Sequence, residues 1–221
     1  MSAHCTGTRM ATATLAPRME VFLIVFVAGG VWLLRAAEQR QRIARLAALL
    51  APYRIERHLQ ALTEGCLRAL GEADADRASA VWGTLHPTGE ALREEIGRFA
   101  DDVARLPPDD LQVSRLPIHL PGAARIPALC FDLRAAVALH ARGIRAALDH
   151  LDALPPDTRR RDAAFTLVAE LMLLQHTCQW YCRSRLIASA RLQALHQTAY
   201  AQVVAGVSAA TRADYRVLVS G

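Results

Sequence analysis

The chain has 221 residues and a formal net charge of +5, with 52% hydrophobic and only 5% aromatic residues. All of its basic residues other than histidine are arginine, and it contains neither lysine nor asparagine. Because a GC-rich coding sequence produces the same bias, the positive charge does not indicate nucleic-acid binding, and no nucleic-acid partner is expected. The five cysteines are an odd number without the spacing of a small disulfide-bonded domain, which argues against a disulfide framework.

Residues 1–18 are rich in Ser, Thr, Ala and Pro and show no hydrophobic periodicity. This composition predicts a disordered N-terminus. Met10 and Met19 are alternative start positions to Met1.

The segment from Val21 to Leu34 contains 14 apolar or glycine residues and no charge. Fourteen helical residues cover only about 21 Å, less than the roughly 30 Å of a bilayer core. The span becomes long enough when it is extended over residues 19–37, with the arginine side chain next to it reaching out to the lipid headgroups. We therefore predict a transmembrane anchor at 19–37, in contact with the lipid bilayer. The residues expected at the membrane interface are Trp32, Arg35, Arg40 and Arg42.

Two other interpretations of this segment stay open. It has the length of a signal-peptide core, with Arg9 and Arg18 as the positive start, although cleavage after Gly30 would leave part of the apolar run on the mature protein. It also has the length of a buried core helix, but four turns without a polar face do not suit a helix at the end of a chain.

Arginines are more frequent after this segment than before it, which predicts the orientation in the membrane. Arg35, Arg40, Arg42 and Arg45 follow the span, whereas only Arg9 and Arg18 precede it. We expect a single-pass protein of the inner (plasma) membrane, with the N-terminus outside and the C-terminal part in the cytoplasm. Unpaired cysteines agree with a cytoplasmic domain.

Apolar residues recur at helical spacing through most of residues 38–221, which predicts an all-α fold. The first helix is expected to continue from the span to residue 51, and a second to cover 55–70. A short helix is expected at 75–85, ended by His86, Pro87 and Gly89, and another at 92–106. The class is therefore one N-terminal transmembrane helix followed by a cytoplasmic helical bundle.

An irregular Pro-rich segment is predicted at 107–127, with a short extended stretch near residues 116–120. A helix is expected at 128–154, and a long C-terminal helix from about residue 158 to about residue 205. Between Phe165 and Cys182 this last helix is apolar on most faces, which predicts the central helix of the core. Glu170 argues against a second membrane span there, because the uncharged run after it has only 12 residues.

The candidate site residues are histidines and cysteines on the last two long helices. Cys178 and Cys182 lie one helical turn apart, but four zinc ligands are not available, so we interpret them as buried apolar residues. His140 and His196 interrupt apolar stripes, and His176 points away from the cysteine pair. The sequence contains none of the motifs of nucleotide-binding or hydrolytic sites and no Glu-x-x-His pair, so no metal or cofactor is expected.

Two hypotheses about function follow. The first is a non-enzymatic membrane-anchored scaffold or interaction module, whose partner is a protein or a second copy of the chain. The alternative is a small helical enzyme or ligand-binding protein with a pocket near His140, His176 and His196. The absence of catalytic motifs favours the first, and convergence of these histidines with a carboxylate in one concave site would favour the second.

Overall fold

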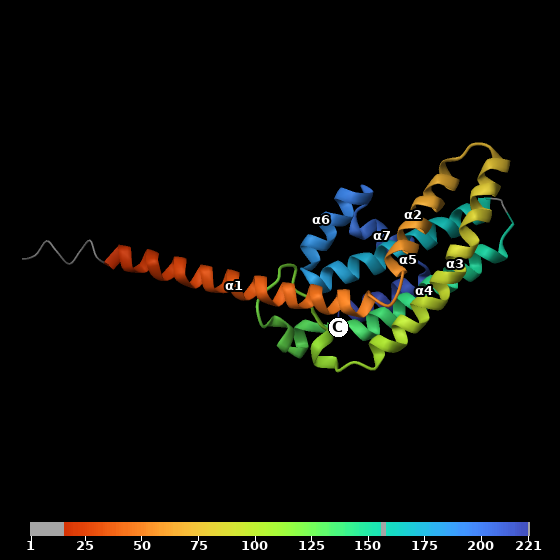
Figure 1. Ribbon diagram of the computed structural model, residues 1–221. Coiled ribbons are helices and arrows are strands. Elements are labelled where there is room, and N and C mark those ends of the chain that lie inside the picture. Colours follow the sequence, from red (N-terminus) through yellow and green to blue (C-terminus); the bar gives the residue numbers. More distant parts are fainter. Residues whose placement is uncertain (1–15, 156–157, 221) are drawn as a thin grey trace, which may run out of the picture.

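The computed structural model describes residues 16–155 and 158–220, so most of the predicted disordered N-terminus (1–18) lies outside the described residues. Within this part of the chain, the fold is a bundle of eight α-helices with one two-stranded sheet, as Figure 1 shows. The all-α prediction is confirmed. The helices are α1 (Ala16–Leu50), α2 (Ile55–Gly71), α3 (Ala75–Ala104), α4 (Leu133–Ala153), α5 (Thr158–Cys182), α6 (Arg185–His196), α7 (Tyr200–Gly206) and α8 (Ala209–Ser220).

Helix α1 projects from one end of the bundle (Figure 1). Every residue from Met19 to Leu34 is exposed, and burial begins at Arg35, where the helix first contacts the bundle. The helix is long and apolar enough to cross a membrane, and none of its most apolar 18-residue window is buried. The continuation of this helix beyond the apolar segment, to Leu50, agrees with the sequence prediction.

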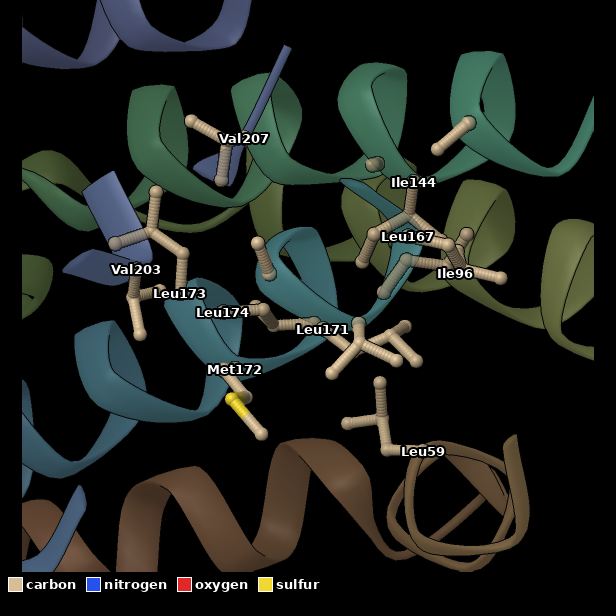
Figure 2. Packing of buried hydrophobic residues seen from close by; sticks show 14 of the residues in the cluster. Leu59, Ile96, Ile144, Leu167, Leu171, Met172, Leu173, Leu174, Val203 and Val207 are labelled. Carbon is tan, nitrogen blue, oxygen red and sulfur yellow. The ribbon is translucent and has the colours of Figure 1, made fainter. Parts of the chain in front are cut away.

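Helix α5 is the centre of the core, as its apolar composition predicts. Leu167 and Leu171 are fully buried, and Figure 2 shows them between side chains of the surrounding helices. The surrounding residues labelled in that view are Leu59 of α2, Ile96 of α3, Ile144 of α4, and Val203 and Val207 at the C-terminal end of the chain. The removal of this apolar surface from water supplies the main driving force for folding.

The predicted break at His86, Pro87 and Gly89 is wrong, because α3 is continuous through Pro87. Trp82 and Leu92 are buried on either side of the proline, so packing against neighbouring helices offsets the hydrogen bond that proline cannot make. A Cβ atom at Gly89 would lie 3.2 Å from the side chain of Leu148, so this glycine permits the close approach of α4.

The prediction of one long C-terminal helix is also wrong. Helix α5 ends at Cys182, and the Ser184 side chain accepts a hydrogen bond from the Ile187 amide, which caps a new helix, α6. Helix α6 ends at His196, and the next residue, Gln197, has a positive φ of 51°. A serine and a glutamine within a helical stripe are only weak sequence signals of a helix end, so the prediction missed both breaks. In the structure, the two breaks allow the chain to turn back onto α5.

The Pro-rich segment is ordered by short elements. Three 3-10 turns at Pro108–Leu111, Ala123–Arg125 and Pro127–Leu129 accompany strands β1 (Gln112–Ser114) and β2 (Cys130–Asp132). The strands are antiparallel, with Val113 opposite Phe131. The extended stretch therefore lies at 112–114 and not at 116–120, and α4 begins at Leu133 and not at residue 128, because the Asp132 side chain caps it at the Arg134 amide.

Candidate functional site

A groove of about 670 Å³ lies between α2 and α6, with α5 as its floor. On α2 the lining residues Ile55, Leu59, Thr63 and Leu67 follow one another at intervals of four, so they form one face of the helix over about 18 Å. The other main lining residues are Leu174, His176, Cys178 and Gln179 of α5, and Ala188, Arg191, Leu192, Leu195 and His196 of α6.

The rim of the groove carries exposed apolar side chains and opposite charges. Leu67 on the α2 side is 45% exposed, and Leu195 on the α6 side is 69% exposed. Glu56 and Glu64 line the α2 side, whereas Arg191 lines the α6 side. The groove thus has an apolar interior, an acidic wall and a basic wall.

His176 is the best-positioned polar side chain at the floor. Its Nε2 lies 3.1 Å from the Ser189 hydroxyl, and its ring stacks on Tyr200 with centroids 4.4 Å apart. Burial lowers the pKa of His176 to about 4, so the ring is neutral at pH 7. Its Nδ1 is buried without a hydrogen-bond partner among the described residues.

Thr63 on α2 is a second buried polar residue of the groove. The residue is only 3% exposed, and its hydroxyl oxygen has no hydrogen-bond partner within the described ranges. A buried polar atom left unpaired costs about 1–3 kcal/mol. Two residues that line the groove thus each hold one buried, unpaired polar atom, Thr63 Oγ1 and His176 Nδ1.

The structure places three of the five candidate pocket residues in this groove: His176, His196 and Cys178. Burial raises the pKa of the Cys178 thiol to about 12 and lowers that of His196. Cys182 does not line the groove, and burial raises its pKa to about 11. Both thiols are therefore protonated and weakly nucleophilic at neutral pH.

His140 lies apart from the groove, fully buried between α4 and α5. The Thr177 hydroxyl donates to the Leu173 carbonyl at 3.0 Å, so His140 Nε2 donates its proton to Thr177 Oγ1 at 2.9 Å. Burial lowers the pKa of His140 to about 3. This histidine is a hydrogen-bonded core residue.

Sequence reasoning missed Thr63, Glu56 and Glu64, which line the groove from α2. A polar row at intervals of four, Glu56, Gln60 and Glu64, runs beside the apolar stripe of α2. This row was the sequence signal that could have indicated a polar wall next to an apolar surface. Nothing local indicated that a groove forms beside the buried stripe and leaves Leu67 at its rim 45% exposed, since that depends on where α6 lies.

The residues predicted at the membrane interface lie along α1. Trp32 is 66% exposed, and Arg35 is half-buried at the start of the bundle. Arg40 donates to the Ala36 carbonyl of its own helix. Arg42 donates to the Tyr181 carbonyl at 3.1 Å and lies over the Tyr181 ring, so it binds α1 to α5.

One further cluster, His86, Glu90 and Asp152, has potential ligand atoms within 4.8 Å of one another. Arg93 forms ion pairs there with Glu90, with Asp149 at 3.0 Å and with Asp152 at 2.9 Å. The Arg93 guanidinium therefore already neutralises the carboxylates that a bound cation would need. The cluster instead holds α3 against α4.

No family model, curated protein or solved structure matches this chain. Its function therefore has to follow from two features: the groove between α2, α5 and α6, and the uncovered apolar half of α1.

Proposed function

We propose that the protein is a single-pass, membrane-anchored interaction module, and that its groove holds the apolar face of a helical segment from a partner protein. Two observations carry the proposal: the uncovered apolar half of α1, which suits lipid, and the groove with exposed Leu67 and Leu195 at its rim, which suits a helix. No catalytic role is assigned to any residue.

The exposed apolar half of α1 supports the membrane anchor. Met19 to Leu34 make no buried contact, whereas a core helix of a soluble protein would be covered by its neighbours. In water, this surface would be an aggregation hazard. The arginines after the span support a cytoplasmic bundle in the plasma membrane.

Carbonate extraction of membranes tests the anchor, and release of the protein into the soluble fraction would refute it.

The mass of the mature protein separates an anchor from a cleaved signal peptide, because cleavage removes residues up to about 30. A reporter fused after Gly221 tests the orientation, and a signal from the outer side would contradict a cytoplasmic bundle.

The shape of the groove supports a helical occupant. Helices α2 and α6 form its walls and α5 its floor, and Leu46, Leu50 and Phe99 complete the lining. The α2 face is about 18 Å long, which suits the packing of one more helix. Apolar residues recur at helical spacing on both walls, at positions 59 and 67 of α2 and 188, 192 and 195 of α6. The acidic α2 wall and basic Arg191 favour one orientation of a charged partner helix.

Site-specific photo-crosslinking in the full-length membrane protein tests this function. A photoreactive residue at Leu195 should give a discrete adduct, and mapping should place the crosslink on an apolar helical face of another protein. The matched control is Val217 of α8, which is 75% exposed but does not line the groove. The substitution Leu67→Asp should abolish the adduct formed from position 195. Adducts of equal yield from positions 195 and 217 would refute the proposal.

A small amphipathic ligand is the second candidate occupant, and the size of the groove favours it. The volume of about 670 Å³ lies within the range of small-molecule pockets. Native mass spectrometry of the purified protein would then show a bound compound that His176→Phe removes, together with no protein adduct from position 195.

A further inference from the structure

The Pro-rich segment and the start of α6 lie at the end of the bundle from which α1 projects, and both carry exposed apolar side chains. Ile118 and Leu120 are each 46% exposed, and Ile126 is 50% exposed, all within the Pro-rich segment. Leu186, at the start of α6, is 59% exposed. The Leu186 amide donates to the Pro117 carbonyl at 3.0 Å, so α6 begins beside this segment. We call these four side chains the apolar end patch.

The patch is held at a defined level along α1. The Gly122 amide donates to Glu38 Oε1 at 3.1 Å, and His119 Nε2 lies 3.2 Å from Glu38 Oε2. His119 is buried, and both contacts fix the Pro-rich segment to this one residue of α1. Figure 1 shows the segment, in green, against α1 at that end of the bundle.

Glu38 directly follows the proposed span of residues 19–37. At about 1.5 Å per helical residue, it lies just outside the hydrocarbon core. The headgroup region extends about 5–8 Å on each side of that core. A segment fixed at Glu38 therefore lies at the depth of the headgroups, where exposed isoleucine and leucine side chains can insert.

The charges around the patch suit an anionic lipid surface. Between Asp110 and Asp132 the chain has two arginines, Arg115 and Arg125, and no acidic residue. Arg35 and Arg42 lie close enough to His119 to lower its pKa, after the larger effect of burial. The neighbouring acid, Glu38, already binds the Gly122 amide and His119.

We propose that the apolar end patch docks onto the cytoplasmic membrane surface, with anionic phospholipids as its ligand. This proposal rests on the membrane anchor proposed above. Docking adds a second attachment beside the span and restricts rotation of the bundle about α1. The groove between α2 and α6 is thereby held in one orientation relative to the membrane.

Fluorescence quenching in vesicles tests the docking. The full-length protein is reconstituted with Trp32→Phe, which removes the tryptophan of the span, and with Ile118→Trp. The matched control carries Phe165→Trp, a 53% exposed site in the N-terminal half of α5, whose opposite end is held to α1 by the hydrogen bond between Arg183 and Gln39. Trp82 and Trp180 are common to both proteins and buried. Lipids brominated on the acyl chains should quench the tryptophan introduced at position 118 at least twofold more than the tryptophan introduced at position 165.

The lipid composition tests the charge argument. Quenching at position 118 should be stronger in vesicles that contain phosphatidylglycerol than in pure phosphatidylcholine vesicles, and high salt should reduce the difference. Equal quenching at positions 118 and 165, with the protein still resistant to carbonate extraction, would overturn the docking and leave the anchor intact. Release by carbonate would instead overturn the anchor itself.

Proteolysis gives an independent measurement. Arg125 is exposed, and docking should protect the bond after it from trypsin added to the bundle side of the vesicles. The double variant Ile118→Glu/Leu120→Glu should be cut there several-fold faster than the natural sequence in vesicles, but at the same rate in detergent. Equal cleavage rates of the double variant and the natural sequence in vesicles would overturn the proposal. A crosslink between the patches of two copies of the chain would also overturn it, because self-association would then explain the protection.

Discussion

Gly143→Ala in α4 should destabilise the bundle, although alanine forms helices better than glycine. A Cβ atom at Gly143 would lie 2.5 Å from Thr211 Oγ1 and 2.6 Å from Glu170 Oε2, far inside normal contact distance. Glu170 is fully buried in α5, and Thr211 is 5% exposed in α8. Gly143 thus provides the space in which α4, α5 and α8 meet.

Neither side chain can move away without loss. Glu170 Oε1 accepts a hydrogen bond from the Ser208 amide at 3.1 Å, just before α8. The Ser208 hydroxyl bonds to Thr211 Oγ1 at 3.0 Å and accepts from the Thr211 amide at 3.1 Å. A displaced Glu170 would give up the amide at the N-terminus of α8, where an acidic group is favoured.

The opposing magnitudes decide the sign. Replacing glycine by alanine inside a helix gains about 0.5–1 kcal/mol. Overpacking a buried site costs about 1–3 kcal/mol, and the disturbed hydrogen bond adds about 1 kcal/mol. We expect a net loss of about 1–3 kcal/mol in the free energy of unfolding, which lowers Tm by about 2–4 °C per kcal/mol in a chain of this size.

Gly97→Ala in α3 is the matched control. A Cβ atom there would meet only an Arg145 side-chain nitrogen at 3.8 Å, an ordinary contact, so this variant should gain about 0.5–1 kcal/mol. Both variants are compared with the natural sequence by circular dichroism at 222 nm, with thermal and urea unfolding in the same detergent. A Gly143→Ala protein as stable as the natural sequence would refute the packing argument.

Three further predictions follow from burial. Leu171→Ala, at a fully buried site of the central helix, should lower the free energy of unfolding by about 2–5 kcal/mol in urea titrations, whereas Phe165→Ala, at a 53% exposed site, should lower it by less. Burial lowers the pKa of His140 to about 3 and that of His176 to about 4, below the unfolded value near 6.5, so the unfolded chain binds more protons in acid. The contribution of these histidines to the free energy of unfolding should be complete above about pH 6.5. As the pH drops towards 4, urea titrations should show a loss of up to about 1.4 kcal/mol per pH unit for each histidine. The substitution His176→Gln should make this pH dependence less steep. Burial raises the pKa of the Cys66 and Cys178 thiols to about 12, so mass spectrometry should find both alkylated by iodoacetamide at pH 8 far more slowly in the native than in the urea-unfolded protein.

Much of the helical fold was readable from the sequence because apolar periodicity and an uninterrupted apolar helix are local properties. The stripe Ile55, Leu59 and Cys66 lies on the buried face of α2, and the apolar run around Leu171 became the central helix. Local signals failed where packing outweighed them, as at Pro87, or where one side chain caps the start of a new helix, as at Ser184. The candidate site was predicted only in part, because His140 and His196 interrupt similar apolar stripes but only His196 lines the groove.

The sequence alone determined the all-helical class, the central place of α5 and the apolar segment suited to a membrane, since composition and period require no knowledge of distant contacts. Only the tertiary structure decided that this segment stands free of the bundle and that burial starts at Arg35. It also decided that α6 turns away after Cys182 and leaves a groove beside α2, and that the Pro-rich segment is fixed to Glu38. These features depend on the distances between helices, and helix spacing is set by the packing of residues that lie far apart in the chain.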